Sequence, residues 1–404
     1  MARVLGPRGS LVGRALVSHF TTPADTAEGK GSESPRQGAE SAALDNNAKS
    51  SGNRLDRWAA RGTQWEYSEL PRVKKCGRVV ITSDGTVGVR ANGESVGYAG
   101  LHTCGSVWAC PVCNAKIQSV RRLEVGVALA SVHANGGGAA FGAITVRHHA
   151  GQRLGGLLDA LTYGIARIGQ DKTVRRLRVE MGYVGSMQAL EFTIGRNGWH
   201  PHRHPLPIFD RPCDPDQLIE LHFAQLRAFA AGVEARGYES PTALGNVLKP
   251  IELGDADTLS DYFTKSTYTA DGVAWEATST QTKKGRAGGR TPWQLLDSVR
   301  INGDADDLEL WNEYELATKG KRALTFSRGL REKLGLNAER SDESIADEEV
   351  GDETDTGFRV LSWAPIVQNP LLGAGLLNAV TPAGNWNAGR EFAWANGITI
   401  GDNE

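Results

Sequence analysis

The middle of the chain alternates between strand-like and helix-like hydrophobic patterns. Strands are predicted over 141–147, 187–194 and 199–209, where β-branched and aromatic residues are frequent. Helices are predicted over 154–168 and 215–237, where apolar residues recur every three to four positions. The resulting order of strand, helix, β-hairpin and helix is typical of an α+β fold rather than of repeated βαβ units. We therefore expect an antiparallel sheet with helices on one face, which leaves its other face open for a ligand.

The flanking segments differ from this middle part in composition. Residues 21–53 are rich in Ser, Gly, Ala, Glu and Lys and have no apolar periodicity, which predicts disorder. Residues 341–356 contain eight acidic residues and no Lys or Arg. The predicted organisation is a disordered tail over 1–55, a Cys-rich module over 56–127, the α+β domain over 128–336, an acidic linker over 337–357 and a C-terminal tail of unassigned role over 358–404.

Overall composition is that of a globular protein, with 404 residues of which 40% are hydrophobic and 23% charged. The formal net charge of -2 averages basic clusters against the acidic segment, an uneven distribution that suits polyanion binding and equally suits a solvated surface. No apolar run is long enough to span a membrane, and Gly and Pro interrupt the first twenty residues, which argues against a secretory signal. Five cysteines, three of them within ten residues, do not resemble a disulfide framework. We expect a cytoplasmic protein with no membrane partner.

A histidine-rich hairpin is the most informative stretch. Asn197-Gly198 favours a type I′ turn, and with these two residues as the loop Glu191 faces His204. Opposed residues of an antiparallel pair project from one face, so Glu191, His202 and His204 converge. Two imidazoles and a carboxylate form a three-ligand site for Mg²⁺ or Mn²⁺ with positions left for a phosphate oxygen. The alternative is an exposed His-rich strand without a metal.

The run 198–204 (GWHPHRH) resembles the signature of HUH endonucleases, in particular the rolling-circle replication initiators of actinobacterial and other Gram-positive plasmids. Residues 141–147 resemble the first motif of this family, and residues 261–265 (DYFTK) resemble its third. The resemblance covers roughly 72–336 and implies a ferredoxin-like or RRM-like sheet in a DNA-nicking domain over 128–336. Two departures are Arg203, where the family has an apolar residue, and Pro205, which cannot donate a ladder hydrogen bond.

The same resemblance implies that Tyr262 is a nucleophile. Its phenolate would attack the scissile phosphorus, leaving a 5′-phosphotyrosyl link and a free 3′-hydroxyl, with Lys265 on the same helical face to stabilise the phenolate or contact DNA. Without this context, Tyr262 would be read as a surface residue. Tyr268 lies six residues further on and points elsewhere on a continuous helix, which disfavours a paired-tyrosine mechanism.

The partners follow from this chemistry. They are origin DNA, duplex and single-stranded, a host helicase and a host DNA polymerase. The chain has no Gly-x-x-x-x-Gly-Lys-Ser/Thr motif for a motor of its own, so a host helicase would have to unwind the duplex.

The cysteines predict a second, structural metal site. Cys104, Cys110 and Cys113 have C-x5-C-x2-C spacing, and the close pair has zinc-knuckle geometry. Cys76 or His102 would complete a zinc tetrahedron, and Cys213 is a weaker candidate. The alternative is that the cysteines pack as small apolar groups. Basic residues that follow on a predicted helix are candidates for docking on duplex DNA, namely Lys116, Arg121 and Arg122.

Three functions remain open from the sequence. The first is a plasmid replication initiator that nicks and rejoins one strand. The second is a transposase or mobilisation relaxase of the same superfamily, although relaxases commonly place the tyrosine ahead of the histidines whereas Tyr262 follows His204. The third is a non-catalytic, zinc-containing DNA-binding regulator, for which a tyrosine near the histidines has no use.

Overall fold

The computed structural model describes residues 54–251, 289–382 and 384–402. The predicted disordered tail over 1–55 lies almost wholly outside these ranges, and so do Tyr262 and Lys265. The described residues fall within one unit, Ser50–Glu404.

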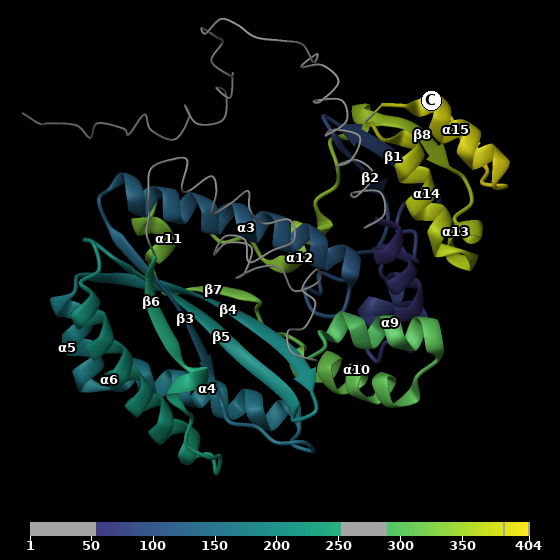
Figure 1. The fold of residues 1–404 in the computed structure, drawn as a ribbon. Coiled ribbons are helices and arrows are strands. Elements are labelled where there is room, and N and C mark those ends of the chain that lie inside the picture. The colour runs from purple at the N-terminus through teal and green to yellow at the C-terminus, as the bar shows by residue number, and fades with distance from the viewer. Residues whose placement is uncertain (1–53, 252–288, 383, 403–404) are drawn as a thin grey trace, which may run out of the picture. The chain divides into compact units, whose positions relative to one another are not determined.

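The larger part of this unit is built around a five-stranded antiparallel sheet (Figure 1). Its order is β6-β3-β5-β4-β7. The strands are β3 (Gly138–Thr145), β4 (Tyr183–Gly195), β5 (Gly198–Phe209), β6 (Val247–Ile251) and β7 (Leu324–Phe326). The long β4–β5 hairpin occupies the centre, as its alternating pattern predicts, and the α+β fold with an antiparallel sheet is confirmed.

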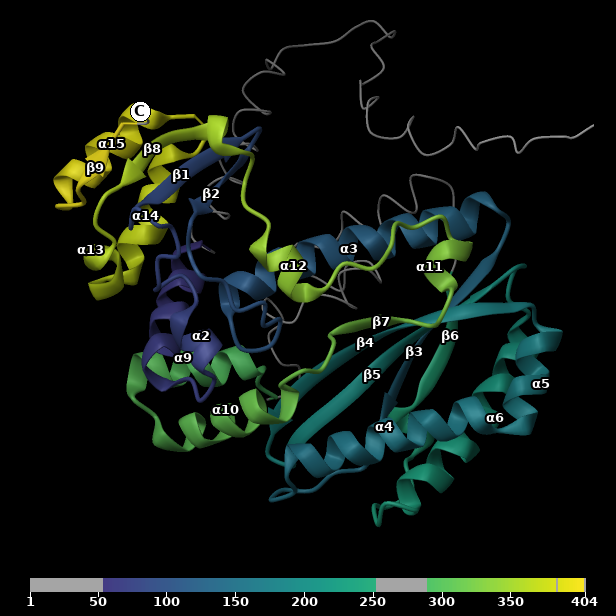
Figure 2. The ribbon, with the colours of Figure 1, turned by 180° about the vertical axis from the view of Figure 1, so that it is seen from behind.

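Helices cover both faces of this sheet, not one face as expected. On one face lie α4 (Leu154–Gln170), α5 (Lys172–Glu180) and α6 (Pro215–Glu234), whose apolar sides share a core with Leu190 and Phe192 of β4. On the other lies α3 (Pro111–Ala134), and Figure 2 shows it across the sheet from α4 and α6. Its C-terminal half supplies Val125, Leu129 and Val132 to a core shared with Met187 and Ile208. Successive residues of a strand point to opposite faces of the sheet. Helices can therefore pack on both faces here, because residues that alternate with the predicted core positions, such as Met187 and Ile208, are also apolar.

A second sheet joins segments from opposite ends of the described chain. Its order is β2-β1-β8-β9 and its strands are β1 (Val87–Asn92), β2 (Ser95–Ala99), β8 (Thr356–Val360) and β9 (Ile400–Gly401). Its helices are α13 (Ala364–Gln368), α14 (Pro370–Val380) and α15 (Trp386–Ala395). The stretch 358–404 was predicted to be a C-terminal tail. It is instead part of a folded region, because Phe358 and Val360 are buried against Val87, Val89 and Trp58.

The acidic run 337–357 is also more than a linker. It contains α12 (Asp342–Asp347) and a short 3-10 helix, η4 (Glu353–Asp355). Ile345 is fully buried in the main core, and Asp342 forms an ion pair with Arg121 of α3. The few apolar residues in this run, which its charge conceals, fix it against α3.

The remaining elements of the described ranges are all helical. They are a helix over 54–67, α2 (Pro71–Lys75), η2 (Ala243–Gly245), α9 (Pro292–Asn302), α10 (Ala305–Thr318) and α11 (Leu330–Lys333). The α9–α10 pair adds Trp293, Trp311 and Tyr314 to the main core. Among the helices of the described ranges, none has the length and apolar character needed to cross a bilayer.

Candidate metal centres

The β4–β5 hairpin turns at Arg196-Asn197, with Gly195 paired to Gly198. The predicted loop was Asn197-Gly198. Gly198 instead opens β5 with a φ of +83°, a left-handed conformation that glycine adopts without strain. This is the arrangement of hairpin loops in which a glycine with positive φ follows the turn.

The turn shifts the register from the predicted one. Glu191 pairs with His202, and Ala189 pairs with His204, whereas the sequence predicted Glu191 opposite His204. The shift is two residues, the period of side chains along a strand, so each side chain keeps its face. Glu191, His202 and His204 still project together, on the α3 face of the sheet.

The three side chains meet at one carboxylate oxygen. Oε2 of Glu191 lies 2.8 Å from Nε2 of His202 and 3.1 Å from Nε2 of His204. One donor atom from each residue lies within 4.8 Å of the others, a spacing that lets a single divalent cation contact all three. Glu191 and His204 are buried and His202 is 15% exposed at its side chain, so the group reaches solvent through His202.

Contacts around His204 fix the orientation of its ring. Nδ1 of His204 lies 3.0 Å from the carbonyl oxygen of Gly142, which only accepts hydrogen bonds. A neutral His204 therefore carries its proton on Nδ1 and directs the lone pair of Nε2 at Oε2 of Glu191. Two acceptors at this distance repel each other unless a cation or a second proton lies between them. The ring of Phe141 stacks on His204 at 5.0 Å and restricts its rotation.

Strand β3 and the turn before β6 support the same group. Thr145 of β3 pairs with His202, and the Thr145 amide donates to the side chain of Asn246 at 3.1 Å. Asn246 is buried and also donates to the carbonyl of Thr242. This network fixes the end of β3 beside the histidines, which is the role of outer partners at metal sites.

His200 shares the face of the two histidines but has a different environment. Its ring stacks on His148 at 4.7 Å. Burial, together with the neighbouring His202 and His148, lowers the pKa of His200 to about 4. His200 is therefore neutral near pH 7 and adds no charge beside the candidate metal centre.

The four cysteines at 76, 104, 110 and 113 form a second group, which we call the cysteine cluster. Sγ of Cys76 lies 3.6 Å from that of Cys110 and 3.5 Å from that of Cys113, and Sγ of Cys104 lies 3.7 Å from that of Cys113. Tetrahedral zinc with bonds of about 2.3 Å places its sulfurs about 3.8 Å apart, so the four thiols fit zinc without rearrangement. Of the candidates for the fourth position, the structure places Cys76 there, and neither His102 nor Cys213 belongs to the group.

Three elements bring these cysteines together. Cys76 ends α2, Cys104 lies in the loop before α3, and Cys110 caps the N-terminus of α3, where its sulfur accepts from the amide of Cys113 at 3.5 Å. Pro111 follows at the first helical position, where a proline is favoured because it needs no hydrogen-bond partner. The close Cys110–Cys113 pair is thus one turn of helix α3.

Arg61 lies beside the cysteine cluster, a position that no pattern in the sequence indicates. It is buried, and its Nη2 lies 3.9 Å from Sγ of Cys76. Burial alone would lower the pKa of Arg61, but the four cysteines outweigh it and raise the pKa. Four thiolates around Zn²⁺ carry a net charge of about -2, and a fixed guanidinium offsets part of that charge.

Two of the three basic residues predicted to dock on DNA make contacts within the protein. Arg121 is buried and binds Asp342 at 2.7 Å and Glu124 at 2.9 Å, so its guanidinium holds α3 to α12 and is not presented to DNA. Nζ of Lys116 donates to the carbonyl of Ala346 in the same interface at 3.1 Å. Arg122 is half-buried, and burial lowers its pKa.

Comparisons with known proteins agree with the resemblance seen in the sequence. The chain is 30% identical over 307 residues to the Rep protein of Streptomyces lividans, covering 61% of this chain and 66% of that protein, slightly less than two thirds. It is 32% identical over 135 residues to a neomycin resistance protein of Streptomyces cyanogenus, covering 27% of this chain and 31% of that protein. No protein-family model matches the chain, and no solved structure is significantly similar to it. The resemblance to an actinobacterial Rep protein is confirmed.

Proposed function

Because this chain is a relative of an actinobacterial Rep protein, we propose that it initiates rolling-circle replication of a plasmid by nicking one DNA strand. The observation that carries the nicking activity is the convergence of Glu191, His202 and His204 on one face of a sheet. Such a group suits a reaction at a phosphodiester because it binds a divalent cation and leaves coordination positions for phosphate oxygens.

The chemistry of the proposed reaction is a transfer of the phosphoryl group to tyrosine. The oxygen of Tyr262 attacks the scissile phosphorus, a bond forms between them, and the bond to the 3′-oxygen breaks. The strand is left with a 5′-phosphotyrosyl link to the protein and a 3′-hydroxyl, which receives a proton and serves as a primer. Attack of a 3′-hydroxyl on this link reverses the transfer and rejoins the strand. A bound Mg²⁺ or Mn²⁺ supplies polarisation of the phosphate and stabilisation of its developing charge.

This chain's own residues prepare that step. Gly142 and Phe141 hold the ring of His204, and Asn246 holds the strand end beside His202. The ligands are then in place before DNA binds, which avoids reorganisation during the reaction. Lys265, three residues after Tyr262, is proposed to stabilise the phenolate, although both residues lie outside the described ranges.

The cysteine cluster has a structural part in this proposal. Zinc held by Cys76, Cys104, Cys110 and Cys113 would fix α2 and the start of α3 against the main core. The partners proposed are the origin DNA, a host helicase that unwinds the duplex, and a host DNA polymerase that extends the 3′-hydroxyl.

The test is a search for a covalent protein–DNA adduct. Full-length protein is incubated with labelled single-stranded oligonucleotides tiled across the origin of its replicon, with Mn²⁺ or Mg²⁺, and analysed on a denaturing gel. We expect an adduct with one oligonucleotide, its loss in EDTA, and its loss in Tyr262→Phe and His202→Ala. His222→Ala, a histidine of α6 away from the group, is the matched control and should form the adduct normally.

Other outcomes select the remaining hypotheses. Specific binding of an oligonucleotide without an adduct in either metal would favour a non-catalytic DNA-binding regulator. An adduct at a transfer origin or a transposon end, with none at the replication origin, would favour a relaxase or a transposase. The relative named for neomycin resistance covers 27% of this chain, and that share does not support a second function.

A further inference from the structure

Arg203 lies between two metal-ligand candidates but points away from them. It pairs with Leu190 of β4 and with Ile144 of β3, so alternation directs it to the face covered by α4–α6. Among the residues that the structure describes, none forms a hydrogen bond or an ion pair with the side chain of Arg203. An arginine side chain stays protonated in proteins, so Arg203 carries its charge into this half-buried position. A half-buried charge without a partner is costly, and such a residue calls for a ligand or a cavity.

A cavity of about 260 Å³ lies at Arg203, between the sheet and the helices. A second guanidinium lines it, that of Arg178 from α5, which lies over the ring of Tyr183 at 4.7 Å. Nε of Arg178 is buried and has no hydrogen-bond partner among the described residues. Gln225 of α6 also lines the cavity and is buried, and its side chain forms no hydrogen bond with a described residue.

The charge of this cavity is one-sided. Of the described residues that line it, two are arginines and none is an aspartate or a glutamate. Hydroxyl and amide groups from β4 and β7 line the polar wall, and Ile165 and Ile168 of α4 line an apolar one. Unused donors on two arginines and a glutamine are suited to an oxyanion, since guanidinium groups bind phosphate oxygens through paired hydrogen bonds.

We propose that this cavity binds a small phosphate-bearing ligand, either free phosphate or the phosphate group of a small metabolite, through Arg203 and Arg178. Its volume is slightly below the range of about 300 to 1,000 Å³ that is usual for small-molecule sites, which suits a ligand as small as phosphate and excludes a folded segment or a DNA strand. The site lies on the opposite face of the sheet from Glu191, His202 and His204, so it is separate from the proposed nicking site. It does not depend on the proposed replication function.

The test measures thermal unfolding of the full-length protein in inorganic phosphate and in a nucleoside monophosphate, against chloride at equal ionic strength. A ligand that binds the folded state raises the Tm in a saturable way. We expect such a rise with at least one of the two probes. A greater affinity for the monophosphate would identify a phosphorylated metabolite as the ligand, and an equal or greater affinity for inorganic phosphate would identify the free anion.

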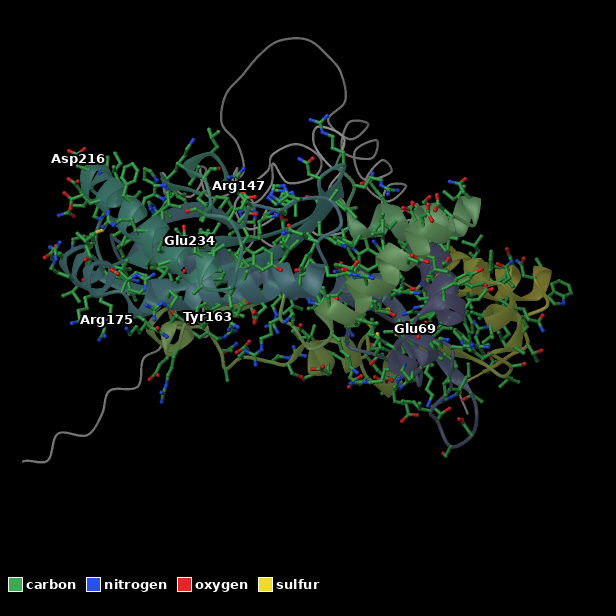
Figure 3. All side chains as sticks on the ribbon, turned by 90° about the horizontal axis from the view of Figure 1, so that it is seen from below. Glu69, Arg147, Tyr163, Arg175, Asp216 and Glu234 are labelled. Carbon is green, nitrogen blue, oxygen red and sulfur yellow. The ribbon has the colours of Figure 1, made fainter. Side chains whose placement is uncertain are left out.

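Two variants and one control assign the response to this cavity. Arg203→Met and Arg178→Met should each weaken the apparent affinity at least tenfold. Arg175→Gln removes an exposed arginine from the same helix, α5, and should bind as the wild type does (Figure 3). Without ligand, Arg203→Met should unfold at the same or a higher temperature than the wild type, because an unpaired half-buried charge has been replaced by an apolar chain.

Three results would overturn the proposal. The first is the absence of a saturable rise in Tm with either probe. The second is a rise in Tm in both Arg203→Met and Arg178→Met that equals the rise in the wild type. The third is a loss of the ligand response in Arg175→Gln as large as that in the two cavity variants, which would show a general charge effect. If Arg203→Met does not fold, Arg178→Met decides the question alone, because Arg178 lies on a helix surface outside the strand pairing.

Discussion

The imidazole of His204 is held by the carbonyl oxygen of Gly142, 3.0 Å from Nδ1. The two residues lie on neighbouring strands, β5 and β3, so the orientation of the ring depends on the pairing of the sheet. This contact assigns Nδ1 as the donor and leaves Nε2 for a metal, the arrangement found around histidine ligands in metal sites.

Metal binding should therefore depend on both histidines. His202→Ala and His204→Ala should each lower Mn²⁺ affinity by at least about 100-fold, because each removes one of three ligands. Titration calorimetry with Mn²⁺ on chelator-treated protein measures this directly. His222→Ala should bind Mn²⁺ with unchanged affinity. Wild-type affinity in either ligand variant, with the fold intact by circular dichroism, would refute the metal assignment.

Removal of one oxygen should separate DNA binding from nicking. Tyr262→Phe should reduce adduct formation by more than about 1000-fold and leave binding of the same oligonucleotide within about twofold, because only the nucleophile is lost. Gel shift and denaturing gel measure the two properties on one sample. Tyr268→Phe is the control and should form the adduct. Undiminished nicking by Tyr262→Phe would show that another group attacks.

The sequence was sufficient to predict the hairpin and the faces of its side chains, but not its register. Alternation over 187–194 and 199–209 placed Glu191, His202 and His204 together, and the two-residue error came from the turn. Asn-Gly pairs occur in more than one loop type, and the position of the positive φ at Gly198 is settled only when both strands pack. A two-residue error in register leaves each side chain on its predicted face of the sheet but changes the residue that it pairs with.

Contacts between segments far apart in the chain could not be predicted from the sequence. Val87 pairs with Val360 in the smaller sheet, and no local pattern in either strand names the other as its partner. The fourth member of the cysteine cluster was left open between Cys76 and His102 for the same reason. The long helix α3 contributes apolar residues to the second face of the large sheet, although its exposed Leu123 and Val127 blur the periodicity that would reveal its buried side.

The cysteine cluster should hold about one zinc per chain. Cys110 and Cys113 changed together to Ser should lose this zinc, because hydroxyls are poor zinc ligands, and should loosen the segment from Cys76 to the start of α3. Metal analysis of protein purified without chelators and limited proteolysis measure the two effects. Nicking of a single-stranded oligonucleotide should change much less than these, since Glu191, His202 and His204 lie on other elements.

Cys213→Ser is the matched control for this experiment. Cys213 is a free cysteine outside the cluster, and its removal should leave the zinc content and the protease resistance unchanged. A wild-type preparation without zinc would return the four cysteines to the role of buried apolar residues, and so would a double variant with unaltered protease resistance.

Glu124 of α3 should make the stability of the protein depend on acidity. Its carboxylate accepts from Arg331 at 2.7 Å and from Arg121 at 2.9 Å. Burial alone would raise the pKa of Glu124, but these hydrogen bonds outweigh it and hold the pKa below its usual value. The carboxylate therefore stabilises the fold above the pKa of the unfolded chain, about 4.3, and this contribution disappears as the pH falls through the lower folded pKa.

Glu124→Gln should accordingly lower the free energy of unfolding by about 2 kcal/mol at pH 7, since it replaces hydrogen bonds to a charged group and leaves Arg331 without its carboxylate partner, whereas Arg121 keeps Asp342. The difference from the wild type should shrink progressively below about pH 4, where the wild-type carboxylate itself becomes protonated. Urea unfolding of both proteins across this pH range measures the change. Glu220→Gln, on the exposed side of α6, should match the wild type at every pH. A deficit in Glu124→Gln that stays constant down to pH 3 would mean that the side chain acts through its packing and not through its charge.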